Sequence, residues 1–566
     1  MAARGDTSVA STLKIPLDPI LVRLLESPHH RGGRSDTVIH DARGFQKTYA
    51  ELLGDVVQTA NSLRKALPPS AFDRQGLLRQ DSPYVSVLVR SGYEFIVAFF
   101  AIRCLGGACM PIASGILVEE AHYLISKAKA ICLLAGDGCH DTAAEICVSD
   151  KKPQGGHRPP WHAISNSTRY SSRGGRGIEL ELDPDLPLDP RSPGLLLFTS
   201  GTTGLPKGVV LPRACFAASA SGRGRTGGGI AVAGAAGLVN GLLEGATLHV
   251  LLETASAGDV LDAVMRHRPS RMSFTPTMLR GVKEAVLARG DPPESYADGF
   301  RGLGALNNTS APLDPSLRDW WVRATGLPIR NRYAATEAGG GISFGGRRCG
   351  SIGTPLPGCE VKVSGVQGGE ILVKTPGMFI GYVSATPGLF PSRKLKTGDT
   401  AEVIDGHVFF AGRAAADYIS FRFYRIPALT VEAAILALPY VRDACVLGVP
   451  FHESKQLCGA VVKVRRNGPQ GEVGLERVRA DLGGVVPKYM LPVVLRVVAE
   501  DEQIPRTHSG KPIKKWILCE LLSTKEWFVA DEVPKGVEYC GCDDPSSAGE
   551  NRARNPWDYG GMQRAL

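Results

Sequence analysis

The sequence has no unbroken apolar run long enough to cross a membrane. Its longest apolar region, residues 227–252, is interrupted by Asn240, Glu244 and His249, whereas a membrane-spanning helix needs about 20 consecutive apolar residues. The first 13 residues also lack the apolar core of a secretory signal. We therefore expect no membrane span and no secretion.

Clusters of one charge sign are missing as well. The net charge of +9 is small for 566 residues, without an arginine stripe or a lysine block, so no nucleic acid partner is expected. The 13 cysteines lack the spacing of zinc sites or disulfide frameworks, which favours a reducing compartment. We expect a cytoplasmic protein. Arg4 and nearby hydroxyl residues leave a mitochondrial presequence as the alternative.

What the chain does contain is a repeated alternation of strands and helices. Residues 85–89 read as a buried strand and residues 93–104 as a helix, and similar pairs recur to about residue 330. The alternation predicts parallel βαβ units in an α/β domain of stacked, doubly wound subdomains. From residue 350 the pattern changes to short strands with turn residues, which indicates a small β-barrel subdomain.

The domain boundaries follow from these changes in pattern, because 566 residues exceed a single hydrophobic core. We expect a flexible N-terminus over residues 1–15, a large N-terminal domain over 16–412, a smaller α+β domain over 413–525, and a disordered tail over 526–566. Residues 150–176 are rich in Gly, Ser, Pro and Arg and are expected to form a disordered loop.

The ten residues from Thr199 to Gly208 follow an apolar strand and contain four hydroxyl side chains, three glycines and Lys207. Glycines let backbone N–H groups converge on phosphate oxygens, hydroxyls add donors, and the lysine adds a positive charge. The spacing differs from a P-loop, because Lys207 precedes a glycine. The composition predicts a phosphate-binding loop; an ordinary Gly/Thr loop is the alternative.

Two other stretches place carboxylates at strand ends or turns. In Thr336-Glu337 the hydroxyl can meet phosphate and the carboxylate can hold Mg²⁺, although such a pair also caps helices. Asp399 follows Lys396-Thr397-Gly398 in an expected tight turn, where it suits a ribose diol. Further on, residues 505–511 form a turn-rich loop that presents Lys511.

Five stretches together resemble the adenylate-forming superfamily of acyl-coenzyme A synthetases, luciferases and nonribosomal adenylation domains. They are Thr199–Gly208, Ser310–Pro312, Tyr333–Glu337, Thr397–Asp399 with Gly412-Arg413, and Pro505–Lys511. The resemblance implies a large domain and a small C-terminal lid that rotates between two half-reactions. A carboxylate first attacks the α-phosphate of ATP to give acyl-adenylate and pyrophosphate, and a thiol then displaces AMP. The implied partners are ATP, Mg²⁺, a small or medium carboxylic acid and coenzyme A.

The resemblance also implies a role for each matching residue. The phosphates would be held by Thr199, Ser200, Gly201, Thr202, Thr203, Gly204 and Lys207. Adenine would be bordered by Ser310, Ala311, Pro312 and Tyr333. Thr336 would contact phosphate and Glu337 would hold Mg²⁺, while Asp399 would bind the ribose with support from Arg413. Lys511 would enter with the lid to bridge the carboxylate and the α-phosphate, and Arg425 would approach the adenylate.

Residues 412–432 look most like the branch that holds malonyl-coenzyme A synthetases. Malonate would need a cation for its second carboxylate. Arg280 follows Thr275-Pro276-Thr277, near the acyl side of the pocket in this family, and a solvated helix arginine is the alternative. The sequence therefore does not identify the acyl group.

Three positions depart from the family's pattern. Between Lys207 and Gly237 the chain is about ten residues short of the family's helix, strand and pocket histidine, either by remodelling or by a faulty gene sequence. Ala415 stands where the lid hinge has an acidic residue or lysine, and Asp417 lies nearby. Phe423 replaces a glycine beside the thiol path; its ring either closes that path or packs against the large domain.

Three functions follow from these observations. The first is an ATP-dependent acyl-coenzyme A ligase. The second is an adenylating enzyme that loads an amine or a separate carrier protein, because the residues after Lys511 are too few for a fused carrier domain. The third is a non-catalytic relative that binds nucleotide, against which the retained Glu337, Asp399 and Lys511 argue.

Overall fold

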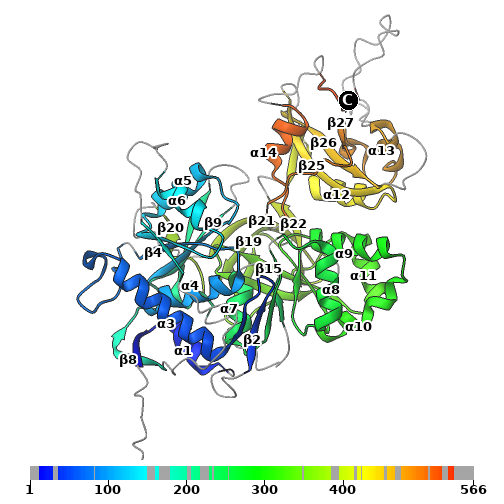
Figure 1. Cartoon of the computed structure of the whole chain (residues 1–566). Helices are drawn as coiled ribbons and strands as arrows, with labels where there is room; N and C mark the ends of the chain where they lie inside the picture. Colours follow the sequence, from blue (N-terminus) through cyan, green and yellow to red (C-terminus); the bar gives the residue numbers. More distant parts are fainter. Residues whose placement is uncertain are drawn as a thin grey trace, which may run out of the picture.

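The structure, a computed structural model, consists of a large body and a smaller lid that stands above one side of it (Figure 1). The lid is drawn in yellow to orange and is formed by the C-terminal part of the chain. The residues described are 12–27, 29, 36–81, 83–148, 160–164, 179–199, 206–216, 229–231, 235–252, 254–346, 350–366, 368–383, 394–413, 417–421, 424–451, 455–465, 473–507, 510–524 and 533–540.

A seven-stranded sheet forms the first layer of the body. Neighbouring strands β9, β5, β4, β6 and β7 run parallel, whereas β10 is antiparallel to both β9 and β20. In sheet order the strands are β20 (Gly381–Tyr382), β10 (Lys207–Pro212), β9 (Pro193–Thr199), β5 (Ala108–Ile112), β4 (Tyr84–Leu88), β6 (Cys132–Ala135) and β7 (Trp161–Ala163). Central strands such as β4 and β6 are buried on both faces, as parallel strands covered by helices usually are.

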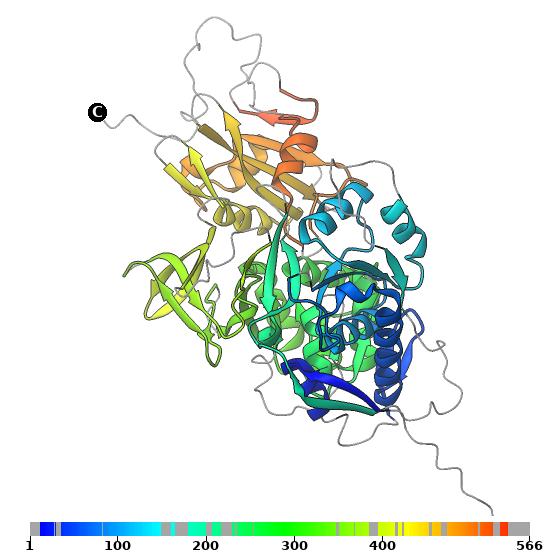
Figure 2. The ribbon, with the colours of Figure 1, turned by 90° about the vertical axis from the view of Figure 1, so that its left-hand side faces the viewer.

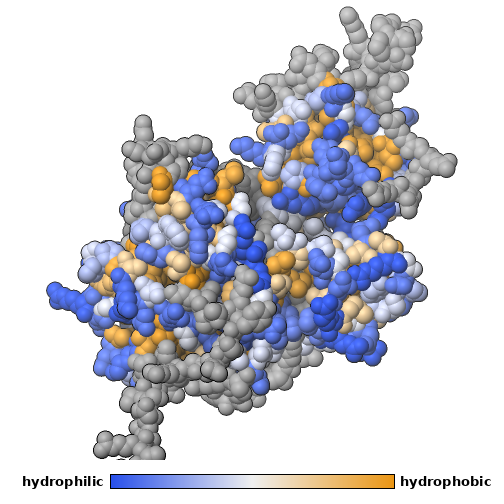
Figure 3. Space-filling view, in the orientation of Figure 1, coloured by the Kyte–Doolittle hydropathy of each residue, from blue (hydrophilic) through white to orange (hydrophobic). Residues whose placement is uncertain are grey.

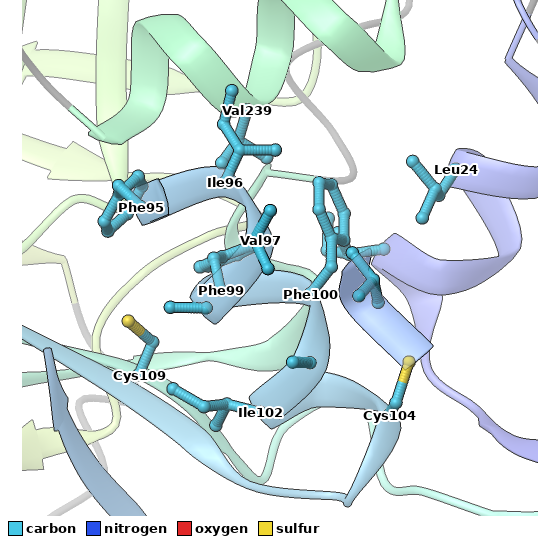
Figure 4. Close-up of a cluster of buried hydrophobic side chains, with 14 of the residues drawn as sticks. Leu24, Phe95, Ile96, Val97, Phe99, Phe100, Ile102, Cys104, Cys109 and Val239 are labelled. Carbon is cyan, nitrogen blue, oxygen red and sulfur yellow. The ribbon is translucent and has the colours of Figure 1, made fainter. Parts of the chain in front are cut away.

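Helix α4 (Gly92–Cys104) lies at the centre of the largest core. Twelve of its thirteen residues are buried, so it is an internal helix rather than an amphipathic surface helix. Figure 4 shows its side chains among Leu24 of α1 (Pro19–Glu26) and Val239 of α7 (Ala235–Leu243). The remaining helices of this part are α3 (Tyr49–Ala66), α5 (Val118–Ala128) and α6 (His140–Val148).

A second region of the body carries a five-stranded sheet and a four-stranded sheet. The five strands are β13 (Ser273–Phe274), β14 (Leu306–Thr309), β15 (Ile329–Ala335), β16 (Gly340–Gly346) and β17 (Thr354–Pro355). The four are β11 (Gly229–Ala231), β12 (Leu248–Val250), β2 (Thr37–Asp41) and β3 (Gln46–Thr48). A separate core lies around α8 (Ala257–His267), α9 (Pro276–Arg289), α10 (Ala297–Phe300) and α11 (Pro315–Thr325). The pair β1 (Thr12–Leu17) and β8 (Glu179–Pro187) is a two-stranded sheet.

The small β subdomain expected from residue 350 onward is an antiparallel four-stranded sheet (Figure 2). Its strands are β18 (Glu360–Val363), β19 (Gly368–Lys374), β21 (Leu395–Ile404) and β22 (His407–Arg413). Asp399 lies inside β21 rather than in the turn that the sequence suggested, because the strand continues through Gly398 with a positive φ of 74°. Glycine adopts that backbone conformation without steric cost.

The lid has its own hydrophobic core, which runs from Ile419 to Tyr539. Its strands are β23 (Tyr418–Phe421), β24 (Tyr424–Pro427), β25 (Val441–Phe451), β26 (Lys455–Val464), β27 (Val494–Val498) and β28 (Val537–Tyr539). Its helices are α12 (Ala428–Leu436), α13 (Leu475–Asp481) and α14 (Lys514–Trp516).

The expected disordered tail from residue 526 is wrong for its described part. Strand β28 pairs antiparallel with β27, and its residues Val537 and Tyr539 are buried in the lid core. Buried and exposed residues alternate in β28, as in any strand that packs one face on a core. The strand is short and surrounded by polar residues, so the sequence did not predict it.

A buried charge cluster joins the N-terminal helix to the end of β10. Asp18, which caps α1, pairs with Arg103 of α4 at 3.0 Å and with Arg213 at 3.1 Å, and all three side chains are buried. Burial lowers the pKa of Arg213 to about 10. Such a cluster is costly to break, because removal of one partner leaves a buried charge uncompensated.

None of the helices in the described ranges has the length and apolar character of a membrane-spanning segment. The face of the molecule visible in Figure 3 mixes hydrophilic and hydrophobic residues.

Candidate functional site

The expected phosphate loop begins and ends in two paired strands. Thr199 ends β9 and lies opposite Lys207, the first residue of β10. The Nζ atom of Lys207 stands 5.8 Å from the centre of the Tyr382 ring, on the neighbouring strand β20. The five residues from Ser200 to Gly204, which were expected to contact phosphate, lie outside the described residues.

Tyr382 also connects to Glu337, which lies in the turn after β15. The hydroxyl of Tyr382 donates a hydrogen bond to Oε1 of Glu337 at 3.2 Å, and the carbonyl of Glu337 accepts one from Phe379 N at 2.8 Å. Burial, with Glu337 as the nearest negative charge, raises the pKa of Tyr382 to about 12. The hydroxyl therefore stays protonated and donates to the carboxylate.

A glycine permits this close arrangement. Gly339 has a positive φ of 71°, and a Cβ atom there would overlap the carbonyl oxygen of Gly377. Any larger residue at position 339 would push apart the turn that holds Thr336 and Glu337 and the segment that leads to β20.

The loop at Ser310 is fixed by Asn308 and Asn331, which the sequence motifs do not include. Asn308 donates to the carbonyl of Ala311 at 3.0 Å and to the side-chain oxygen of Asn331 at 3.1 Å, and Asn331 donates to the carbonyl of Ser351 at 3.0 Å. Ser310 has a φ of 77°, a left-handed conformation that serine adopts only when its surroundings impose it. The only available signal was that each of the two neighbouring strands carries an asparagine at its third position.

Asp399 and Arg413, which were expected at the ribose, form one hydrogen-bonded group with Tyr333, which was expected beside adenine. Tyr333 donates its hydroxyl to Oδ2 of Asp399 at 2.7 Å, and Arg413 donates Nε–H to Oδ1 at 3.0 Å. Asp399 and Tyr333 are buried, whereas the Arg413 side chain is half exposed. Burial and the Asp399 charge raise the pKa of Tyr333 well above its usual range. Side chains from β15 and β22 thus meet at the carboxylate of Asp399 on β21.

The lid hinge is held by Asp417, two residues after the expected hinge position Ala415, which is not among the described residues. One oxygen of Asp417 accepts the Arg413 backbone N–H at 3.0 Å, and the other pairs with Lys514 of α14 at 3.0 Å. The carboxylate therefore connects the last residue of the body sheet to the lid helix.

Lys511 reaches this group from the lid. Its backbone N–H donates to the Thr507 hydroxyl at 3.2 Å, within a turn closed by the bridge between Arg506 and Pro512. Burial lowers the pKa of Lys511, and the charge of Arg413 acts in the same direction. Asp399, Asp417 and Glu337 act in the opposite direction. The lysine is thus within electrostatic reach of both Asp399 and Glu337.

The lid is seated in this position by charged contacts with α9. Arg280 pairs with Asp443 of β25 at 3.1 Å and with Asp314 at 3.5 Å, and Arg465 pairs with Glu284 at 2.6 Å. Arg280 therefore serves the boundary between lid and body, so neither the acyl-side assignment nor a solvated helix arginine describes it.

Two expected features of the lid stay untested. Arg425 lies in β24, opposite Ser420, but its side chain and Phe423 fall outside the described residues. Most of the short segment between Lys207 and Gly237 lies outside them too.

The chain matches known proteins over both parts. Residues 29–383 match the AMP-binding enzyme family, and residues 430–511 match the AMP-binding enzyme C-terminal domain. The acyl-CoA ligase oryP of Aspergillus oryzae is 29% identical over 88% of this chain and 92% of its own length. The mitochondrial malonate–CoA ligase ACSF3 of Bos taurus is 26% identical over 79% of this chain and 82% of its own.

A solved structure shows the same fold. The o-succinylbenzoate CoA synthetase (MenE) of Bacillus subtilis, in complex with its acyl-adenylate intermediate, aligns with a TM-score of 0.69 at 20% identity, over 90% of this chain and 99% of that one. The expected family and the expected α/β fold of a large N-terminal and a small C-terminal domain are confirmed.

Proposed function

The chain belongs to the AMP-binding enzyme family, and from its site we propose that it is an ATP-dependent acyl-coenzyme A ligase. It joins a small carboxylic acid to the α-phosphate of ATP with release of pyrophosphate, and then transfers the acyl group to the thiol of coenzyme A. ATP, Mg²⁺ and coenzyme A are the partners that this reaction requires.

The observation that carries the proposal is the place of Lys511. The lid brings this lysine into electrostatic reach of Arg413 on β22, Asp399 on β21 and Glu337 in the turn between β15 and β16. A binding protein without activity would have no need of a lysine delivered by a second domain to the carboxylates that face a nucleotide.

The residues present suit a nucleotide and a magnesium ion. Asp399, with Tyr333 and Arg413 on its two oxygens, would receive the ribose hydroxyls. Among the described residues no three His, Cys, Asp or Glu side chains gather into a metal site, so Glu337 would hold Mg²⁺ together with phosphate oxygens and water, as is usual for this ion. Bound there, Mg²⁺ would neutralise charge on the phosphates.

The chain's own residues act mainly by position and charge. A carboxylate is a weak nucleophile, and negative charge builds up on the phosphate oxygens during the displacement, so fixed donors contribute most. Lys511 would donate to the acyl carboxylate and the α-phosphate, Thr336 to phosphate, and Lys207 would stabilise the departing pyrophosphate. The buried Tyr333–Asp399 pair would hold the nucleotide still while this happens.

The acyl acceptor and the acid are the finer parts of the proposal. Coenzyme A is favoured because the ligases oryP and ACSF3 bear that activity in their names, and a separate carrier protein or an amine is the alternative. A malonate-like acid is favoured by the name of ACSF3. We place the protein in the cytoplasm, with mitochondria as the alternative that the name of the bovine relative suggests.

One assay separates these functions. The protein is incubated with ATP, Mg²⁺ and a panel of carboxylic acids, with hydroxylamine as a trap, in the presence or absence of coenzyme A. Pyrophosphate, hydroxamate and thioester together support the ligase, whereas hydroxamate without thioester would indicate transfer to another acceptor. Absence of pyrophosphate with every acid would refute both enzymatic functions.

A further inference from the structure

Three residues on one face of helix α9 contact the lid. Arg280 and Glu284 form the ion pairs with the lid described above. Thr277, one turn closer to the start of the helix, donates its hydroxyl to the carbonyl of Gly510 at 3.4 Å. Spacings of three and seven residues place these side chains in one stripe, and α9 lies on the side of the body that faces the lid (Figure 1).

The contact at Gly510 lies one residue before Lys511 in the chain. The Gly510 carbonyl also accepts a hydrogen bond from Nη1 of Arg506 at 3.0 Å. One oxygen thus takes a donor from the body and a donor from the lid, as the two lone pairs of a carbonyl allow. The body therefore touches the lysine loop beside the lysine itself.

The loop around this contact is closed by its own hydrogen bonds. The backbone N–H of Thr507 donates to the carbonyl of Lys511 at 2.7 Å, and the N–H of Gly510 donates to the carbonyl of Thr507 at 2.8 Å. Because these bonds fix Lys511 relative to Gly510, a displacement of the Gly510 backbone displaces the lysine with it.

Thr277 leaves no room for a side chain at position 510. A Cβ atom on Gly510 would stand 2.7 Å from the hydroxyl oxygen of Thr277 and 3.2 Å from its Cβ. The energies of the Arg280 and Glu284 ion pairs change gradually with distance, whereas the energy of a steric contact changes steeply. The ion pairs therefore attract the lid, and the Thr277 contact sets the position at which the lysine loop stops.

We propose that Thr277 is a positioning residue for Lys511 and acts in adenylate formation only. The proposal rests on the ligase function above, in which the lid takes another orientation for thioester formation. A misplacement of about 1 Å at a reacting group costs on the order of 100-fold in rate. A contact that fixes the lysine loop therefore changes the kcat of adenylate formation rather than the KM for ATP or for the acid.

The test uses the full-length protein and the acid that gives the fastest pyrophosphate release. Thr277→Val removes the hydroxyl and keeps the shape of the side chain, whereas Thr277→Ser keeps the hydroxyl. Gly510→Ala and Thr277→Ala are made singly and together. For each protein, kcat and KM for pyrophosphate release are measured, together with the rate of thioester formation from supplied acyl-adenylate and the melting temperature.

Two control variants match these changes. Thr354→Val removes a hydroxyl that donates to the Phe344 carbonyl at the same distance of 3.4 Å, within the body. Gly484→Ala adds a Cβ atom to a lid glycine that has a φ of 84°, with no atom of the described residues within 4 Å of that Cβ. It imposes the same kind of backbone strain as Gly510→Ala, whose φ is 80°, but no contact. Both controls should keep the wild-type kcat.

Thr277→Val should lower the kcat of pyrophosphate release about threefold to fivefold, the effect of one neutral hydrogen bond. Its KM values and its rate of thioester formation should stay at the wild-type values, and Thr277→Ser should retain most of the kcat. Gly510→Ala should lower the kcat at least ~10-fold. Addition of Thr277→Ala should recover part of that loss, although Thr277→Ala alone is slower than the wild type, because the two positions are in contact.

Four results would overturn the proposal while leaving the ligase function intact. They are equal losses in both half-reactions of Thr277→Val, a rise in its KM for the acid alone, no recovery in the double variant, and the Gly510→Ala loss reproduced in Gly484→Ala. If Gly510→Ala fails to fold, the comparison of Thr277→Val with Thr277→Ser decides, since equal kcat values would refute the role of the hydroxyl. A wild type without pyrophosphate release from any acid would refute the ligase function, and this proposal with it.

Discussion

Arg280 on α9 and Asp443 on β25 form an ion pair of 3.1 Å that joins the body to the lid. Asp443 also accepts hydrogen bonds from Arg506 at 2.9 and 3.3 Å, and Arg506 bridges to Pro512 around the loop that carries Lys511. One carboxylate thus links a helix of the body to the base of the loop that carries Lys511. We infer that this pair stabilises the lid orientation in which Lys511 faces the nucleotide residues.

Asp443→Asn should weaken this orientation. Arg506 would lose its ion pair with Asp443 and Arg280 would keep only Asp314, so the lid would spend less time with Lys511 in place. Adenylate formation should slow by about tenfold for a loss of ~1.4 kcal/mol. Hydroxamate formation measures this step. Thioester formation from a supplied acyl-adenylate, which needs the other lid orientation, should be unchanged or faster.

The control for this variant is Asp262→Asn. Asp262 on α8 forms an exposed ion pair with Arg289, which lies on α9 as Arg280 does. Exposed pairs contribute little, so this variant should keep the wild-type rate. Equal losses in both half-reactions of Asp443→Asn would show that the residue supports folding rather than lid orientation.

Lys511→Ala should abolish adenylate formation while ATP still binds. The side chain comes from the lid, whereas the ribose and phosphate residues lie in the body, so its loss removes transition-state stabilisation more than ground-state affinity. Pyrophosphate exchange and equilibrium ATP binding measure the two effects. Lys515→Ala, at an exposed position four residues further on, is the control, and an unchanged exchange rate in Lys511→Ala would refute the assigned role.

Adenylate formation should also decline at alkaline pH as Lys511 loses its proton. Burial and Arg413 lower the pKa of Lys511, so the decline should begin below the ordinary lysine value of about 10.4. The pH profile of pyrophosphate release measures this, and a rate that stays constant past that value would contradict a role for the protonated amine.

Tyr382→Phe should raise the Mg²⁺ concentration needed for activity. The Tyr382 hydroxyl orients the Glu337 carboxylate through one oxygen, and loss of such a supporting partner commonly weakens metal binding by about tenfold or more. A Mg²⁺ titration of pyrophosphate release measures the change, with the KM for the acid as the internal control. A shift in the KM for the acid alone would place Tyr382 at the substrate instead.

Most of the fold and the site framework could be predicted from local patterns. The helix expected over residues 93–104 matches α4, Gly92–Cys104. Tyr333, Asp399 and Arg413, which the resemblance assigned to the nucleotide, are joined by hydrogen bonds. These motifs are short and contiguous, so each one carries its chemistry without knowledge of the rest of the chain.

What could not be predicted depends on contacts between distant segments. Tyr382 and Glu337 are joined only because β20 pairs with β10, and Arg280 meets Asp443 only when the lid is docked. None of these pairings leaves a periodic signal in the sequence, because each one is set by three-dimensional packing rather than by local spacing.

Three stacked histidines should make stability depend on pH. His249 on β12 lies between His40 and His267, with ring centres 4.9 and 3.9 Å apart. Burial, followed by the charges that His267 and His40 would carry, lowers the pKa of His249 to about 4, against about 6.5 in an unfolded chain. Between these values the unfolded state binds a proton that the folded state does not, so stability should fall as the pH decreases from about 6.5 toward 4.

The variant His249→Gln isolates this effect, because glutamine cannot take up the proton. We expect its melting temperature to fall less than that of the wild type between pH 7 and pH 4.5, whatever its value at neutral pH. His407→Gln, which replaces an exposed histidine on β22, should follow the wild type. If His249 took up a proton equally well in the folded and unfolded states, the variant would show the same pH dependence as the wild type. Parallel curves of melting temperature against pH for all three proteins would therefore show that the stack does not exclude the proton.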